Sequence, residues 1–154
     1  MTEHNVTAVE PSLEHPLHGL QVRSVKNGRF NLPHAFRIPG EDRYVVCPGP
    51  SAIPMLQPYS IWLHKFKNVG RDKSPAERRE AKRKLSMVSQ VVDPDQQGRI
   101  AVSESYLESA GITTKIAIVG MGNYMELWNP DVLERSTADG DEEIDADVLD
   151  EFFD

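Results

Sequence analysis

The chain has 154 residues, of which 39% are hydrophobic and 27% charged, with a formal net charge of −7. This composition is typical of one or two small globular domains. The single cysteine, Cys47, excludes an internal disulfide and fits a reducing cytoplasm. The first residues lack the basic and apolar pattern of a secretory signal, and no apolar run is long enough to span a bilayer.

The negative charge is concentrated at one end of the chain. Residues 139–154 hold nine acidic side chains and no basic one, which leaves 15 acidic and 17 basic side chains in residues 1–138. We therefore expect a mildly basic body and an acidic, disordered tail over residues 136–154. Such a tail could pair with a basic partner.

The first half of the chain favours short strands separated by turns. Residues 1–17 are expected to form a flexible arm. The predicted elements that follow are a strand at 20–25, a loop at 26–29, a strand at 30–32, a short helix at 33–37, a strand at 44–47, a strand at 55–58 and a helix at 59–69. We place the 55–58 strand at a sheet edge, because Pro58 cannot donate a hydrogen bond to a neighbour.

A basic helix is predicted between the two halves. Ser74, Pro75 and Glu77 form a strong helix start, and the helix is expected to reach about Ser89. Ala81, Leu85 and Val88 would form its apolar stripe. Its other faces carry Arg78, Arg79, Lys82, Arg83 and Lys84. These cations would either be solvated or pair with acidic groups of the tail or of a neighbouring subunit.

The second half repeats the pattern of the first. After the segment Val91-Val92-Asp93-Pro94, its predicted elements are a strand at 100–102, a helix at 103–110, a hairpin of strands at 116–119 and 124–128, and a helix from about residue 129. The Gly-Met-Gly-Asn sequence at 120–123 is interpreted as the turn of that hairpin, since a strand and not a helix follows it.

Two short loops carry the chemistry that suggests a function. In Asp95-Gln96-Gln97-Gly98-Arg99, Gly98 permits a positive φ and the Asp95 carboxylate can accept nearby backbone N–H groups. Arg99 would project a guanidinium suited to phosphate or to a guanine edge. Lys26-Asn27-Gly28-Arg29 repeats the Gly-Arg order, which indicates an internal duplication. Each loop taken separately could be a structural hairpin turn.

Together these features resemble the MraZ family, a tandem-repeat branch of the AbrB-like DNA-binding proteins. The resemblance rests on the paired loops at 25–29 and 95–99, the helix start at 74–79 and the hairpin at 119–128. Two departures stand out. Val25 replaces the Asp that is usual in the first loop, so that loop lacks its carboxylate, and Ser103 replaces a common Pro.

The resemblance implies an α+β fold of two tandem AbrB-like swapped-hairpin halves, which form a pseudo-symmetric small β-barrel with flanking helices. The halves would cover residues 18–66 and 88–135, with a linker and an inter-repeat helix at 67–87.

The resemblance also implies a cytoplasmic, nucleoid-associated transcriptional regulator. It would repress a cell-division and cell-wall gene cluster, bind short direct repeats in double-stranded promoter DNA, and assemble as a homo-oligomeric ring. The residues expected to form the DNA interface are Lys26, Asn27, Gly28, Arg29, Asp95, Gln96, Gln97, Gly98 and Arg99.

An alternative is an oligomeric interaction or scaffold protein whose DNA binding is lost or weak, which the low body charge, Val25 and the acidic tail favour. An enzyme is the least favoured class, because no nucleophile–base or metal-ligand constellation is visible. We expect no catalytic residue, no metal, no cofactor and no membrane partner.

Overall fold

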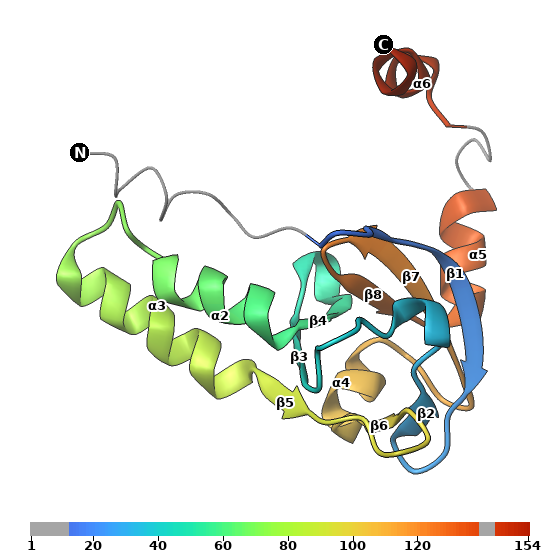
Figure 1. The fold of residues 1–154 in the computed structure, drawn as a ribbon, viewed down its shortest axis with the longest axis horizontal. Helices are drawn as coiled ribbons and strands as arrows, with labels where there is room; N and C mark the ends of the chain where they lie inside the picture. Colours follow the sequence, from blue (N-terminus) through green and yellow to red (C-terminus); the bar gives the residue numbers. More distant parts are fainter. Residues whose placement is uncertain (1–12, 139–143) are drawn as a thin grey trace.

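The computed structural model describes residues 13–138 and 144–154. It has a mixed α+β architecture, as predicted, in which a curved antiparallel sheet carries a long helical arm on one side (Figure 1). The elements, in chain order, are β1 (Leu17–Ser24), β2 (Arg29–Asn31), η1 (His34–Phe36), β3 (Tyr44–Pro48), η2 (Pro50–Ala52), β4 (Pro54–Pro58), α2 (Tyr59–Asn68), α3 (Pro75–Val88), β5 (Gln90–Val92), β6 (Arg99–Ala101), α4 (Glu104–Ser109), β7 (Lys115–Gly122), β8 (Met125–Trp128), α5 (Pro130–Ala138) and α6 (Ala146–Phe153).

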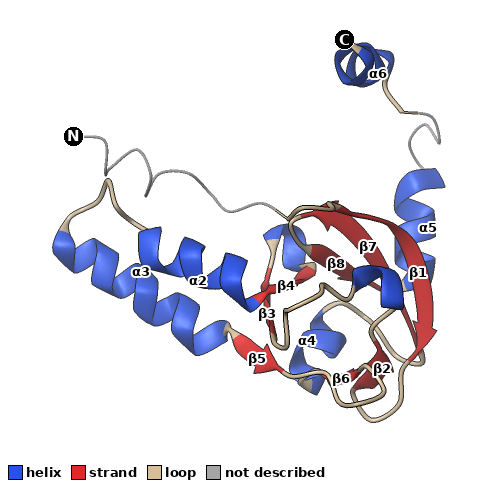
Figure 2. Ribbon diagram, in the orientation of Figure 1, coloured by secondary structure: helices blue, strands red, loops and turns tan. Residues whose placement is uncertain are grey.

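The main sheet combines strands from the first and the second half of the chain. Its six strands follow the order β1-β7-β8-β4-β3-β5 and are all antiparallel (Figure 2). β1 of the first half pairs with β7 of the second, and β5 of the second half pairs with β3 of the first. The β4–β8 pair lies at the centre. Each half therefore completes the sheet of the other.

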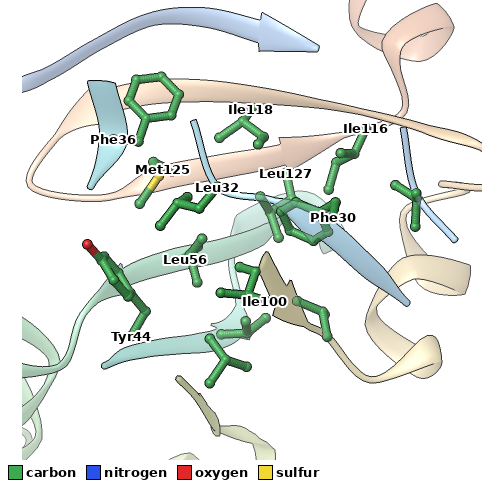
Figure 3. Packing of buried hydrophobic residues seen from close by; sticks show 14 of the residues in the cluster. Phe30, Leu32, Phe36, Tyr44, Leu56, Ile100, Ile116, Ile118, Met125 and Leu127 are labelled. Carbon is green, nitrogen blue, oxygen red and sulfur yellow. The ribbon is translucent and has the colours of Figure 1, made fainter. Parts of the chain in front are cut away.

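A second, two-stranded ribbon of β2 and β6 packs on this sheet. Phe30 and Ile100 lie directly opposite each other in the ribbon and are 2% and 1% exposed. They point into one buried cluster together with Leu56, Ile118 and Leu127 from the sheet (Figure 3). The alternation of apolar and polar residues in both ribbon strands thus places one face in the core and leaves the other face in solvent.

Helices α2 and α3 form an arm that extends away from the sheet (Figure 1). The predicted capping box is present: the Ser74 hydroxyl accepts the Glu77 N–H at 3.2 Å, and the Glu77 carboxylate accepts the Ser74 N–H at 3.1 Å. Trp62 and Phe66 stack on each other within α2. The two helices contact each other through Lys82 of α3, whose Nζ lies 5.8 Å from the Phe66 ring centroid, and through Arg78, which donates to the Lys67 carbonyl.

The expected edge position of the 55–58 strand is wrong. β4 lies between β8 and β3 inside the sheet. Pro54 and Pro58 are tolerated there because they stand at the two ends of β4, while Met55 and Leu56 between them pair with β8.

The two ends of the described chain also differ from expectation. β1 begins at Leu17, which is buried, so the last residue assigned to a flexible arm belongs to the sheet; residues 1–12 lie outside the described residues. Within the predicted disordered tail, α5 continues to Ala138 and Ala146–Phe153 form α6. Asp145 caps α6 by accepting the Asp147 N–H at 2.8 Å, and an alternation of apolar and acidic side chains follows. Residues 139–143 are not described.

Among the described helices, none combines the length and the apolar character needed to cross a membrane.

The buried cluster predicts a strong asymmetry between two neighbouring strands. Ile118→Ala in β7 removes a fully buried side chain and should lower the free energy of unfolding by about 2–5 kcal/mol. Leu20→Ala in the adjacent β1, where the side chain is 54% exposed, should cost less than about 1 kcal/mol. Urea unfolding at one fixed protein concentration measures both. Equal losses would contradict the assignment of Ile118 to the core.

Candidate nucleic-acid interface

The loop between β5 and β6 is held by the Asp95 carboxylate. Its Oδ1 accepts the backbone N–H groups of Gln97 at 2.8 Å and Arg99 at 2.9 Å, and its Oδ2 accepts Arg99 Nε at 3.0 Å. The Gly98 N–H donates to the Asp95 carbonyl at 2.9 Å, and Gly98 has a φ of 80°. The predicted hydrogen bonds from backbone N–H groups to the Asp95 carboxylate are therefore present, and we call this set of contacts the Asp95 lock.

The loop between β1 and β2 reaches a similar shape by a different route. Lys26 and Arg29 exchange two backbone hydrogen bonds of 3.0 Å. The two residues between them, Asn27 and Gly28, have φ values of 54° and 75°. Two consecutive positive φ values are typical of a type I′ hairpin turn, for which Asn-Gly is the preferred sequence. Val25 is buried and supplies no side-chain acceptor, so backbone geometry alone shapes this loop.

The two loops are tied to each other across the molecule. The Gly28 carbonyl accepts the N–H of Val102, which follows β6, and the Gly98 carbonyl accepts the N–H of Leu32, which follows β2; both bonds are 2.8 Å long. A Cβ atom on Gly28 would lie 2.7 Å from the Val102 carbonyl oxygen. Glycine is therefore required at Gly28 by this close approach as well as by its φ.

The solvent face of the β2–β6 ribbon brings both Gly-Arg sequences together. Arg29 lies opposite Ala101 and Asn31 opposite Arg99, so all four side chains share the outward face of the ribbon. A groove of about 510 Å³ opens beside this face. It is lined by Arg23, Ser24, Lys26, Asn27, Arg29, Phe30, Asn31 and Arg99. Four of these side chains are cationic and two are amides.

The predicted residues divide between this groove and a second depression. Lys26, Asn27, Arg29 and Arg99 line the groove. Asp95, Gln96 and Gly98 line a smaller depression of about 160 Å³, which also contains Glu41 and Asp42. The Gly28 carbonyl accepts the hydrogen bond from the Val102 N–H. The Gln97 carbonyl accepts a hydrogen bond from the Asn31 side-chain amide at 3.0 Å. The nine predicted residues therefore form two groups: one lines the cationic groove, and the other shapes the two loops.

Sequence reasoning missed Arg37, which braces the second loop. Its Nε donates to the Leu32 carbonyl at 2.8 Å, and its Nη2 donates to Asn31 Oδ1 at 3.1 Å and to the Gln97 carbonyl at 3.3 Å. Its guanidinium also occupies the space that a side chain at Gly98 would need. The sequence feature that could have indicated Arg37 is the alignment of the two repeats, in which Arg37 ends the segment that follows the first loop.

Arg23 was also missed, because it lies in β1 and not in a loop. The β1 strand leads directly into the first loop, and Arg23 joins Lys26 and Arg29 along the groove. An arginine two to three residues before a cationic loop was the signal that could have found it.

Electrostatics keep the Asp95 lock charged at neutral pH. The hydrogen bond from the Arg99 backbone N–H lowers the pKa of the Asp95 carboxyl below its ordinary value, and the bonds from Gln97 N–H and the Arg99 side chain add to this effect. By contrast, burial raises the pKa of the Cys47 thiol, which fits its role as a small core side chain.

In the part of the chain that the structure describes, no group of three or more His, Cys, Asp or Glu side chains is placed to hold a metal ion.

Comparisons with known proteins show which proteins this chain resembles. Residues 87–147 match the family described as "MraZ protein, putative antitoxin-like". A protein of Anaeromyxobacter sp. named transcriptional regulator MraZ is 35% identical over 134 residues, which cover 82% of this chain and 89% of that protein. Proteins of the same name from Corynebacterium urealyticum and Bordetella pertussis are 29% and 27% identical, over 72% and 81% of this chain and 78% and 89% of their own lengths.

The Asp95 lock predicts a pH-dependent loop. Because the folded pKa is lowered, the lock contributes fully above the ordinary carboxyl pKa of about 3.9 and is lost as the pH falls through the lower folded value. A ¹³C titration of the Asp95 carboxyl should therefore have its midpoint below about 3.9.

At neutral pH, Asp95→Asn should accelerate amide hydrogen exchange at Gln97 and Arg99. Asp93→Asn is the matched control, since Asp93 lies in the same connection but pairs with Arg43 and not with the N–H groups of Gln97 and Arg99. Unchanged exchange at Arg99 in Asp95→Asn would refute the lock.

Proposed function

This chain belongs to the MraZ family, and we propose that it is a sequence-specific DNA-binding transcriptional regulator that contacts DNA through its two Gly-Arg loops. The cationic groove beside the β2–β6 ribbon carries the proposal, because it unites side chains of both halves on one exposed face. Relatives named transcriptional regulators support the same function.

The groove has the chemistry that DNA recognition needs. Arg23, Lys26, Arg29 and Arg99 supply the positive charge that binds phosphates. Arginine forks can also bond guanine edges in the major groove, and the amides of Asn27 and Asn31 can bond adenine or phosphate. The Asp95 and Arg37 contacts reduce the conformational entropy that the second loop would lose on binding.

The fold that we propose for this function is a pair of AbrB-like swapped-hairpin halves, at residues 18–66 and 88–135, which form a small β-barrel. The exchange of β1 and β5 between halves, and the symmetric order of strands around β4 and β8, support it. Residues 67–87, which include most of α3, would then serve as the inter-repeat linker and helix.

One chain offers two short loops, which is little contact for operator-level affinity. We propose that several copies form a closed ring that presents its loops to short direct repeats in double-stranded promoter DNA, so that effective concentration strengthens binding. Repression of a cell-division and cell-wall gene cluster, from a nucleoid-associated position in the cytoplasm, is the role that the family resemblance favours.

A scaffold protein with weak or lost DNA binding is the second candidate. The net charge of −7, and Glu41 and Asp42 beside the second loop, favour it. A gel shift with the DNA upstream of the protein's own gene separates the two candidates: retarded DNA supports the regulator, and unretarded DNA at low salt supports the scaffold.

The unequal bracing of the loops predicts unequal mutational effects. Arg99→Ala should weaken operator binding by about 1–3 kcal/mol and by more than Arg29→Ala, because Asp95 and Arg37 hold the second loop more firmly. Fluorescence anisotropy over a salt series measures this loss. We expect roughly two to four phosphate contacts per chain, each adding about 0.9 to the salt slope.

Arg135→Ala on α5, outside the groove, is the control and should leave binding unchanged. Equal losses for Arg29→Ala and Arg99→Ala would contradict the ranking.

The assembly is tested without DNA. Light scattering at micromolar concentration should give a mass several times that of the 17.3 kDa chain. A monomer that still binds its operator at full affinity would refute the ring while leaving the DNA interface intact.

A further inference from the structure

We propose that helix α6 of one copy docks on the basic α2–α3 arm of a second copy, with its apolar face in the groove at the base of α3. The inference rests on the proposed association of copies and names a contact for it. It does not depend on how the loops bind DNA.

Helix α6 has a surface that no described residue covers. Phe152 and Phe153 are each 79% exposed, and Val148 and Leu149 are exposed beside them. Side chains four residues apart lie on the same face of a helix, so Val148 lies over Phe152 and Leu149 over Phe153. Exposed aromatic side chains in an eight-residue helix indicate a docking segment.

The rest of α6 is strongly acidic. Asp147 and Glu151, and likewise Asp150 and Asp154, are spaced four residues apart and flank the apolar face. Ala146–Asp154 contains no basic residue. The family match ends at residue 147, so most of α6 lies beyond the matched residues. Its partner must offer an apolar groove bordered by positive charge.

The α2–α3 arm has the required charge. Residues 59–88 contain nine basic and three acidic side chains, a net charge of +6, whereas residues 139–154 carry −9. Lys84 is paired with Glu80 at 3.3 Å, and Arg78 donates to the Lys67 carbonyl at 2.8 Å. Arg79 and Arg83 are exposed and have no ion pair or hydrogen bond within the described parts of the chain.

An apolar groove continues the line of these two arginines. Arg79, Arg83 and Met87 follow each other at intervals of four residues and so form one stripe along α3. Met87 is 78% exposed and lines a groove of about 620 Å³ where α3 meets the sheet. The other apolar residues of this groove are Pro48, Ala52, Pro54, Val88 and Tyr106. The spacing of Arg79 and Arg83 matches that of Asp147 and Glu151.

The geometry favours a second copy over the same chain. Helix α5, which precedes α6, lies at one end of the long axis of the molecule, and the arm extends toward the other end (Figure 1). Seven residues separate α5 from α6, a reach of at most about 25 Å. We therefore assign the arm of a neighbouring copy as the partner of α6.

Disulfide trapping of the full-length chain tests the contact. Two variants are made, Met87→Cys and Phe153→Cys, and each is oxidised separately and after mixing, without DNA. The native Cys47 is buried and should contribute little background, which the unmodified chain measures. We expect a cross-linked dimer of one Met87→Cys chain and one Phe153→Cys chain, abundant only in the mixture.

Charge reversal separates a specific contact from random collision. Adding Arg79→Glu and Arg83→Glu to the Met87→Cys chain should reduce trapping by about threefold or more, and so should raising the salt to about 0.5 M. Reversing Asp147 and Glu151 to Lys in the Phe153→Cys chain should restore trapping with the reversed arm. Circular dichroism confirms that each variant is folded.

Three outcomes would overturn the inference. Trapping within one chain, in a protein carrying both cysteines, would show that α6 docks on its own body. Stronger trapping of Phe153→Cys by Leu20→Cys would place α6 at the groove between β1, β7 and α5. In the third outcome, the Arg79→Glu and Arg83→Glu substitutions leave the trapping yield unchanged but lower operator affinity. That result would identify the arm as a DNA contact. None of these outcomes removes the loops from the proposed DNA interface.

Discussion

Two backbone hydrogen bonds hold the two Gly-Arg loops together: the Val102 N–H donates to the Gly28 carbonyl and the Leu32 N–H donates to the Gly98 carbonyl, each at 2.8 Å. In each bond a loop glycine of one half accepts an N–H from the other half. The pairing of β2 with β6 places both Gly-Arg sequences on one ribbon, and Phe30 and Ile100 of this ribbon point into the shared core. A side chain at Gly28 would meet the Val102 carbonyl, and one at Gly98 would meet the Arg37 guanidinium, so substitution of either glycine would disturb both loops.

Local chemistry explains why the loops could be predicted from sequence. An Asp four residues before an Arg, with Gly between them, has few ways to satisfy its carboxylate, and the structure contains the expected lock. The Ser74–Glu77 capping box was predictable for the same reason, since its partners are three residues apart. Most strands and helices follow from apolar periodicity, with ends shifted by a few residues.

Features that depend on distant segments could not be predicted in this way. The central position of β4 depends on β8, about 70 residues away in sequence, and not on its two prolines. Arg37 acts on a loop 60 residues further along the chain. Leu20 and Val22 alternate with polar residues, which predicts a strand with one buried face. In the structure both side chains are half-exposed, because their face of β1 borders a groove with α5 instead of the core. The apolar residues of α6 were visible in the sequence, whereas its acidic composition favoured disorder.

The pairing of β1 with β7 and of β5 with β3 joins distant parts of one chain, and this affects how the fold responds to dilution. If the halves were separate polypeptides, every completed sheet would require two molecules to meet, and the folded fraction would fall with concentration. Tandem fusion makes that encounter intramolecular, with the local concentration of one half around the other set by the chain that joins them. A scarce protein built in this way keeps its paired loops folded at abundances where an equivalent two-chain version would come apart.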